Sequence, residues 1–288
     1  MKPDYVTTEY INSFIEQAIA EDIGDGDHSS LSTIPADLQG FASLKIKQNG
    51  IIAGLEIARE IFDKIDPKLV PLFNKKDGEQ VRAGEIAFEV KGSVRSILGA
   101  ERLVLNCMQR MSGIATYTHH LNELIEGTSA KILDTRKTTP NLRPLEKWAV
   151  TIGGGTNHRF ALYDMIMLKD NHIDYSGGIS NALKSANDYL KQTGKQLKIE
   201  IETRNLNEVK EVLKTGGADV IMLDNMDTET MKKAVGIIGG KMKTEASGGI
   251  TEENILEMAR TGVDYISIGA LTHSVKSLDM SLKAKIEK

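Results

Sequence analysis

The chain of 288 residues carries a formal net charge of -4 and a pI near 5.9, with 40% hydrophobic and 26% charged residues. This balance is ordinary for a globular protein and argues against nucleic-acid binding, which needs a basic surface. No apolar run approaches the roughly 18 residues of a membrane span, and the first residues lack the apolar core of a secretory signal. We therefore expect a cytoplasmic protein with neither membrane nor nucleic-acid partners.

The first part of the chain predicts a small α+β domain. Apolar residues at helical spacing predict a helix over 8–20, and alternation of apolar and polar residues predicts a strand over 41–47. Helical periodicity returns over 58–65 and 97–111. Cys107, the only cysteine, lies within the last of these patterns, so we interpret it as a buried filler and exclude an internal disulfide.

After residue 115 the pattern changes to short apolar runs, each followed by a polar residue and a helical stretch. Alternating units of this kind build a parallel sheet, either open or closed into a barrel. Six runs are clear, so the barrel is incomplete or its other strands are weakly marked. The runs are 130–133, 165–168, 197–201, 220–223, 244–246 and 265–268.

Chemically useful residues follow each of these runs. Because the carboxyl ends of parallel strands meet at one mouth of a barrel, we expect these residues to converge there. In chain order they are Asp134-Thr-Arg-Lys, Lys169, Glu202, Asp224-Asn225, Ser247-Gly-Gly and Gly269-Ala.

Cationic side chains are concentrated between residues 132 and 172, although the chain as a whole is acidic. The pattern indicates a site for a strongly anionic small molecule. The alternative is a solvated charged face, but these residues follow apolar runs instead of lining a helix. They are Arg136, Lys137, Arg143, Lys147, His158, Arg159, Lys169 and His172.

Carboxylates occupy the middle strands of the predicted sheet. Glu200 and Glu202 alternate along one strand and point to the same face, and Asp224 follows the next strand. Buried carboxylates need cations or hydroxyl donors, which magnesium or ribose hydroxyls could supply. Internal salt bridges with Lys137 and Lys169 are the alternative, and the two interpretations are compatible.

Glycines follow the last two runs, at Ser247-Gly248-Gly249 and Gly269-Ala270. Backbone amides exposed by such glycines, next to helix N-termini, can bind a phosphate. An ordinary turn is the alternative for the triplet taken alone. A mouth with cationic, acidic and phosphate-binding parts predicts glycosyl transfer from a phosphorylated sugar to an anionic acceptor.

Motifs across most of the chain resemble the quinolinate phosphoribosyltransferase family. Ten segments occur in order, and their joint occurrence is specific although each alone is not. They begin with Ala20-Glu-Asp-Ile-Gly-Asp-Gly-Asp, Ile52-Ala-Gly-Leu-Glu, Ala100-Glu-Arg-Leu-Val-Leu-Asn, Met111-Ser-Gly-Ile-Ala-Thr and Asp134-Thr-Arg-Lys-Thr-Thr-Pro. They continue with Gly153-Gly-Gly-Thr-Asn-His-Arg, Leu168-Lys-Asp-Asn-His-Ile, Met222-Leu-Asp-Asn, Ala246-Ser-Gly-Gly-Ile and Ile268-Gly-Ala-Leu-Thr-His-Ser.

This resemblance implies a reaction in which quinolinate and phosphoribosyl pyrophosphate, with Mg²⁺, give nicotinate mononucleotide, pyrophosphate and carbon dioxide. It also implies an N-terminal α/β sandwich over residues 1–114, rejoined by 272–288, and an open or incomplete α/β barrel over 115–271. The family forms dimers in which one subunit's N-terminal domain covers the other's barrel, so Arg102 is expected to reach the partner's site.

The resemblance also implies roles for the residues of the barrel mouth. Arg136, Lys137, His158, Arg159 and Lys169 would hold the two quinolinate carboxylates and the pyrophosphate, beside Thr135. Glu202 and Asp224 would face the ribose and the metal, and with Lys137 and Lys169 they form the expected catalytic set. Ser247, Gly248, Gly249, Ile268, Gly269 and Ala270 would bind the 5′-phosphate.

Gly216-Gly217 adds a residue to the family pattern, which leaves open whether Glu200 or Glu202 is the main ribose and metal carboxylate. Other functions also remain open. One is a paralogue of the same fold with another acceptor, and another is nicotinate phosphoribosyl transfer without carbon dioxide release. A Schiff-base aldolase would use Lys137 or Lys169 as nucleophile, and a nucleotide sensor would bind without turnover.

Overall fold

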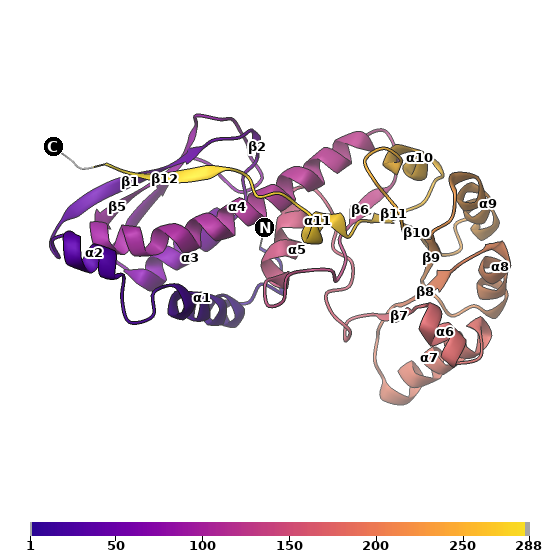
Figure 1. Ribbon diagram of the computed structural model, residues 1–288. Coiled ribbons are helices and arrows are strands. Elements are labelled where there is room, and N and C mark those ends of the chain that lie inside the picture. Colours follow the sequence, from indigo (N-terminus) through magenta and orange to yellow (C-terminus); the bar gives the residue numbers. More distant parts are fainter. Residues whose placement is uncertain (1, 286–288) are drawn as a thin grey trace. The chain divides into compact units, whose positions relative to one another are not determined.

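The computed structural model describes residues 2–285, which form two compact units that we describe separately (Figure 1). The first unit contains the chain up to His119, residues 138–154, and the chain from Leu271 onward. The second contains His120–Lys137 and Gly155–Ala270. Among the described residues, no helix combines the length and the apolar character that a membrane span requires.

The first unit is built on a four-stranded antiparallel sheet. Its strand order is β12 (Met280–Lys285), β1 (Gln39–Ile46), β5 (Ile86–Ser93) and β3 (Val70–Phe73), and β2 (Gly50–Ile51) pairs separately with β4 (Gln80–Val81). The last strand therefore pairs with the first one. The helices are α1 (Thr8–Asp22), α2 (His28–Thr33), α3 (Leu55–Ile65), α5 (Arg143–Ile152) and most of α4 (Val94–Leu124).

Aromatic side chains join α3 to this sheet. Phe62 of α3 meets Phe88 of β5 edge to face, with ring centroids 5.6 Å apart, and Phe73 of β3 lies 5.4 Å from Phe88. Phe62 and Phe88 are fully buried. Such aromatic contacts stabilise a core beyond the area that they bury, and they make the unit the α/β sandwich that the sequence predicted.

Helix α4 is longer than the predicted helix over 97–111. It continues through Gly113, a residue that lowers helix propensity. A Cβ at Gly113 would collide with the backbone carbonyl of Lys276, so the missing side chain lets the segment before β12 cross the helix closely. The segment is fixed there by a bond from the Leu278 N–H to the Gln109 carbonyl at 3.0 Å.

Helix α5 belongs to the first unit, although the sequence predicted residues 115–271 to form one domain. Its Glu146 is fully buried and accepts bonds from Arg110 Nε and Nη2, at 3.0 and 2.8 Å. The same carboxylate accepts from the Thr139 N–H and hydroxyl at 3.0 and 2.9 Å. These bonds tie α5 and the loop before it to α4.

The second unit is an open α/β barrel. Six parallel strands lie in the order β6 (Lys131–Leu133), β11 (Tyr265–Ser267), β10 (Lys243–Ser247), β9 (Val220–Asp224), β8 (Ile199–Thr203) and β7 (Ile166–Leu168). All six predicted strands are confirmed. The described strands β6 and β7 are the two edges and do not pair, and the only link beyond β6 is an isolated bridge from Leu133 to Thr156. The barrel is therefore incomplete.

Helices follow the strands on the outer side of the sheet (Figure 1). They are α6 (Asp170–Tyr175), α7 (Ile179–Thr193), α8 (Leu206–Thr215), α9 (Thr228–Ile238) and α10 (Ile255–Arg260), and the short α11 (Ala270–His273) follows β11. Side chains cap two of them: Asn205 accepts N–H bonds at the start of α8 and Asp227 does so at α9. Because the six strands are parallel, their carboxyl ends all face one side of the unit.

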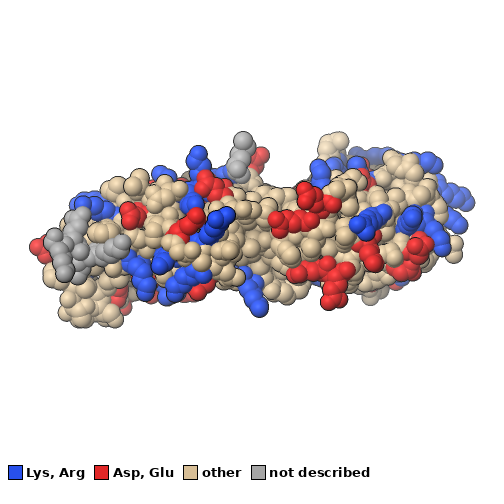
Figure 2. Space-filling model, turned by 90° about the horizontal axis from the view of Figure 1, so that it is seen from above, with Lys and Arg blue, Asp and Glu red and all other residues tan. Residues whose placement is uncertain are grey.

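Charged residues of both signs are interspersed on the face shown in Figure 2, and neither sign forms a continuous stripe there.

Candidate active site

The carboxyl ends of the barrel strands surround a cavity of about 350 Å³. Nine of its lining residues are among those predicted from the sequence, so charges of both signs converge at one opening. The lining residues are Thr135, Arg136, Lys137, His158, Arg159, Met167, Lys169, Glu202, Met222, Asp224, Glu245, Ser247 and Ser267. We call this space the substrate cavity.

Strand register explains the convergence. Glu202 pairs with Met222, Met222 with Glu245, and Asp224 with Ser247 across β8, β9 and β10. Because side chains alternate along a strand, residues of this set share the inner face of the barrel. Lys169 follows β7 directly and begins α6.

The acidic side of the substrate cavity is formed by Glu202 and Asp224. Burial, followed by the negative charge of Asp224, raises the pKa of Glu202, and the Lys169 ammonium opposes this rise. Asp224 also accepts a bond from the Asn225 side-chain amide at 2.6 Å. The two carboxylates therefore repel one another and favour any cation placed between them.

The basic side contains Arg136 and Arg159. Arg136 Nε is buried and finds no hydrogen-bond partner among the described residues. Burial, followed by the charge of Arg136, lowers the pKa of Arg159, whose guanidinium donates to the Met165 carbonyl at 3.2 Å. Two adjacent guanidinium groups with unused donors are a ready site for carboxylates.

Asp134 fixes the segment that carries His158. This fully buried carboxylate accepts a bond from the Asn157 side-chain amide at 2.6 Å and another from the His158 N–H at 2.9 Å. Asp134 follows β6 immediately, so the carboxyl end of β6 holds the segment Asn157–His158 in place.

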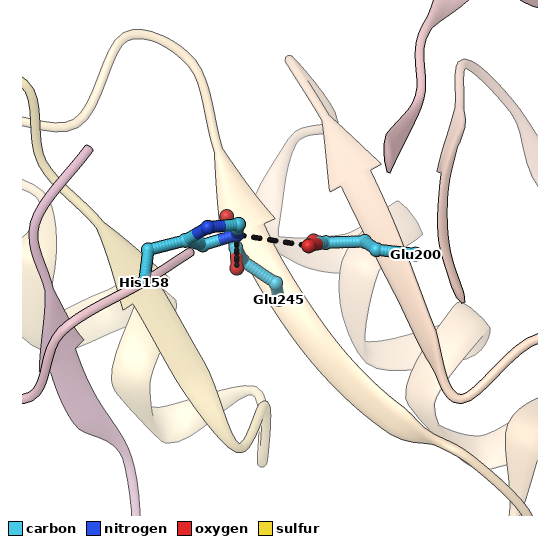
Figure 3. A group of neighbouring side chains, drawn as sticks. All are labelled: His158, Glu200 and Glu245. Carbon is cyan, nitrogen blue, oxygen red and sulfur yellow. Dashed lines mark hydrogen bonds and ion pairs between the residues drawn. The ribbon is translucent and has the colours of Figure 1, made fainter. Parts of the chain in front are cut away.

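His158 in turn faces two buried carboxylates (Figure 3). Its Nε2 lies 2.8 Å from Glu200 Oε2 and 3.3 Å from Glu245 Oε2, and both glutamates are essentially inaccessible to solvent. Burial alone would lower the pKa of His158, but hydrogen bonds and charge from the two glutamates outweigh it and raise the pKa to about 10. Burial and the Glu245 charge raise the pKa of Glu200 to about 7.

The two glutamates of β8 lie at different depths. Glu202 lines the substrate cavity, whereas Glu200 lines a second cavity of about 390 Å³. Residues at the amino-terminal ends of strands, such as Lys198, Asp219 and Lys243, line this second cavity, which we call the rear cavity. His158, Arg159 and Glu245 line both cavities, and sequence analysis had left the choice between Glu200 and Glu202 open.

Glu245 is the acidic residue that sequence analysis missed. It lies two residues before Ser247 on β10, so strand alternation places it on the same inner face. An acid within the apolar run 244–246 was a usable signal. Met167, Met222 and Ser267 also line the substrate cavity without having been predicted.

Six predicted site residues do not line the substrate cavity. Gly248 has φ +89°, and a Cβ there would collide with the Asn225 side chain, so the turn after β10 requires glycine. The Ile268 N–H donates to the Leu133 carbonyl at 3.0 Å. Arg102 is exposed on α4 in the other unit. The remaining three are Gly249, Gly269 and Ala270.

Other residues of interest lie elsewhere. Arg143 and Lys147 belong to α5, and His172 Nδ1 accepts the Lys169 N–H at 3.0 Å. Cys107 is buried, which raises the pKa of its thiol to about 12. This supports its interpretation as a filler, since the thiolate is the reactive form.

Comparisons with protein families and known proteins agree with one another. The family model of the quinolinate phosphoribosyl transferase N-terminal domain matches residues 27–112, and that of the C-terminal domain matches 114–283. The chloroplastic nicotinate-nucleotide pyrophosphorylase [carboxylating] of Arabidopsis thaliana is 46% identical over 302 residues, covering 100% of this chain and 86% of its own. A probable nicotinate-nucleotide pyrophosphorylase of Bacillus subtilis is 44% identical, covering 94% of this chain and 92% of its own.

Solved structures show the same likeness. The crystal structure of NadC from Streptococcus pyogenes superposes with a TM-score of 0.93 at 38% identity, covering 98% of this chain and 99% of the other. Human nicotinic acid phosphoribosyltransferase has a TM-score of 0.58 at 11% identity, covering 93% and 73%, which shows a shared fold only.

Proposed function

The chain belongs to the quinolinate phosphoribosyltransferase family, and we propose on that premise that its substrate cavity carries out the family's reaction. Phosphoribosyl passes from phosphoribosyl pyrophosphate to the ring nitrogen of quinolinate, and carbon dioxide leaves, giving nicotinate mononucleotide in NAD biosynthesis. The observation that carries this proposal is one cavity with guanidinium groups on one side and carboxylates on the other.

The basic side fits an aromatic dicarboxylate. Arg136 and Arg159 present planar forks that bind carboxylates bidentately, and Lys137 and Lys169 add charge for the pyrophosphate. Binding there removes the repulsion between the two guanidinium groups. We propose that these residues, with His158 and Thr135, hold quinolinate and orient its ring nitrogen toward the sugar.

The acidic side fits a ribose that becomes positive. Departure of pyrophosphate leaves an oxocarbenium-like carbon, which Glu202 and Asp224 stabilise by charge. Once the ring nitrogen is alkylated, its positive charge stabilises the electron pair left on the adjacent ring carbon when the carboxylate departs as carbon dioxide, and a proton from water then adds to that carbon. A protein nucleophile is therefore unnecessary, and the buried Cys107 supplies none.

The same carboxylates fit a magnesium ion. Burial and then the charge of Asp224 raise the pKa of Glu202, and a hard divalent cation held by oxygen ligands would relieve the repulsion between the two carboxylates. We propose that Glu202 and Asp224 would hold Mg²⁺ together with substrate pyrophosphate, and the bound ion would supply positive charge to the leaving group. In isothermal titration calorimetry, phosphoribosyl pyrophosphate should bind the wild-type enzyme in a manner that depends on Mg²⁺. Its binding to the Asp224→Asn variant should no longer depend on Mg²⁺.

The 5′-phosphate is the remaining part of the sugar substrate. We propose that the loops Ser247–Gly249 and Ile268–Ala270 bind it through backbone N–H groups. Support comes from the tight turn at Gly248 and from Ser247, whose side chain lines the substrate cavity.

We further propose a homodimer in which Arg102 acts in the partner's site. Mixing Arg102→Ala with Lys169→Ala tests this, because a mixed dimer then regains one site with both residues intact. Random mixing should restore about a quarter of wild-type activity. Activity no higher than that of the separate variants would refute the shared site. A cytoplasmic location also stays a prediction.

An acceptor panel tests the function itself. Wild-type enzyme with phosphoribosyl pyrophosphate and Mg²⁺ should convert quinolinate, and conversion of nicotinate should be lower by orders of magnitude because half of the carboxylate contacts are lost. Preference for another acceptor would identify a paralogue. Borohydride-trapped carbonyl substrate on Lys137 or Lys169 would identify an aldolase instead.

A further inference from the structure

We propose that Glu245, together with Glu200, is a positioning residue that orients the His158 ring and presents it to the substrate cavity as a fixed cation. The inference rests on the proposed function, in which His158 faces quinolinate. Neither glutamate needs to touch a substrate for this role, because both act through His158.

The geometry of this three-residue cluster is well defined. Glu200 comes from β8 and Glu245 from β10, and Nε2 of the imidazole faces the carboxylates of both (Figure 3). Nε2 is 2.8 Å from one carboxylate and 3.3 Å from the other, and the ring is only 7% exposed. The backbone of His158 is fixed separately by Asp134 at 2.9 Å. The ring and the backbone of His158 are therefore held by different carboxylates.

A neutral imidazole would be the default without these carboxylates. The cations that line the two cavities around His158 are Arg136, Lys137, Arg159, Lys169, Lys198 and Lys243. The acidic side chains besides the pair are Glu202, Asp219 and Asp224 along the walls and Asp134 behind the ring, with Tyr265 in the rear cavity. Burial and like charges would expel the ring proton. Two carboxylates in direct contact reverse that preference.

One contact opposes a charged ring, and magnitudes decide between them. The Arg159 N–H points at His158 Nδ1 from 2.7 Å, a bond that exists only while Nδ1 is unprotonated. The Nε2–H group donates to the two carboxylates whether the ring is neutral or charged, so what the second proton adds is the direct attraction between a cation and two buried anions within 3.3 Å, which exceeds one neutral hydrogen bond. The attraction of the two carboxylates therefore outweighs the lost Arg159 bond, and the protonated imidazole is the stable form.

A metal ion is the competing occupant of the cluster. Among the described residues, the one group of side chains close enough together to bind a metal ion consists of His158, Glu200 and Glu245. Ligation through Nε2 would place the ring proton on Nδ1 and break the Arg159 bond, as protonation of the ring also does, so this bond does not distinguish the two occupants. Each glutamate also keeps one oxygen, Oε1, that has no partner among the described residues. The Nε2 proton reaches the other oxygen of both, so the protonated ring and a metal ion are alternative occupants that metal analysis of the purified enzyme distinguishes.

A double-mutant cycle on the full-length enzyme tests the proposal. The variants are Glu245→Gln, His158→Asn and the pair, with Glu257→Gln on the exposed face of α10 as a matched control. Glu245→Gln removes the charge with little change of shape, so we expect the KM for quinolinate to rise about tenfold with a smaller change in kcat. In the His158→Asn background the same substitution should change KM less than about twofold.

The pH profile distinguishes positioning from a merely structural role. In Glu245→Gln the ring loses its proton at lower pH, so the KM for quinolinate should climb between pH 6 and 9 more steeply than in wild type. Glu245→Asp keeps the charge and should restore most of the wild-type profile. Equal costs of Glu245→Gln in both backgrounds, or parallel pH profiles, would overturn the proposal.

A readout independent of turnover covers misfolding and failure of the proposed function. Nitrogen-15 NMR of labelled histidines, with His158 assigned by its loss in His158→Asn, should show both ring nitrogens protonated at pH 8 in wild type. Glu245→Gln should shift the ring to the neutral form, whereas the control Glu257→Gln should leave both ring nitrogens protonated. A neutral ring in wild type, or a stoichiometric metal lost on Glu245→Gln, would overturn the positioning role while leaving the reaction itself intact.

Discussion

Replacement of Arg136 by alanine should separate catalysis from stability. Arg136 lines the substrate cavity, and its Nε has no partner among the described residues, so the folded protein does not depend on its hydrogen bonds. Its charge also lowers the pKa of the neighbouring Arg159, which is a repulsion that alanine would remove. We expect Arg136→Ala to melt at or slightly above the wild-type temperature.

The catalytic cost follows from the contacts that Arg136 would make with a substrate carboxylate. Two charge-assisted bonds of roughly 1.5–3 kcal/mol each give roughly 3–6 kcal/mol in total. At about 1.4 kcal/mol per factor of ten, kcat/KM for quinolinate should fall by roughly 10² to 10⁴.

Steady-state kinetics and differential scanning calorimetry on the same preparation measure both effects. Arg260→Ala, at an exposed position in the last turn of α10, is the control and should change neither. Near-normal quinolinate kinetics in Arg136→Ala would refute the assignment of the basic side. A lower melting temperature together with lost activity would refute the argument that Arg136 serves binding alone.

Three further predictions concern the glycine turn, the titration of the histidine and the cysteine. Gly248→Ala should raise the KM for phosphoribosyl pyrophosphate and destabilise the protein by more than about 2 kcal/mol, because the new Cβ would collide with the Asn225 side chain. In Gly249→Ala the new Cβ meets no atom within 4 Å, so urea unfolding should show a loss of only about 1 kcal/mol from backbone strain. The His158 pKa of about 10 exceeds its unfolded value of about 6.5, so the stability that the proton contributes is present below pH 6.5 and is lost as pH rises toward 10. Urea unfolding at pH 7, 8 and 9 should show this loss in wild type and less of it in His158→Asn. Iodoacetamide should leave native enzyme fully active, because burial raises the Cys107 pKa to about 12; rapid inactivation at pH 8 would contradict this.

The barrel could be predicted because its strands obey a simple rule. Each apolar run is short, is followed by a helical pattern and ends in a polar residue, so the strand ends identify one edge of the sheet. The convergence of Lys169, Glu202 and Ser247 in one cavity follows from that rule. Alternation along β8 and β10 would have placed Glu245 there too, but its run is only three residues long.

The grouping of α5 with the first unit could not be predicted from periodicity. It depends on the buried contact between Glu146 and Arg110, which are far apart in sequence. The continuation of α4 through Gly113 depends likewise on the segment near Lys276. Contacts between residues far apart in the chain produce no local sequence pattern. The positive φ of 63° at Asn141, in contrast, follows from the tolerance of asparagine for that conformation.

The rear cavity and the His158 cluster depend on depth within the barrel. Sequence alternation shows that Glu200 and Glu202 face inward but not which one meets the substrate. The structure separates them by one step of the strand, with Glu202 at the mouth and Glu200 beside His158. That difference is set by strand register, which no local pattern in a single strand encodes.

Release of labelled carbon dioxide from quinolinate carrying carbon-14 in the carboxylate beside the ring nitrogen tests the account most directly. With phosphoribosyl pyrophosphate and Mg²⁺, wild-type enzyme should release one carbon dioxide for each nicotinate mononucleotide formed, and without the sugar phosphate it should release none. Release without phosphoribosyl pyrophosphate, or nucleotide formation that retains the label, would contradict a reaction in which the alkylated ring nitrogen stabilises the electron pair that the departing carboxylate leaves behind.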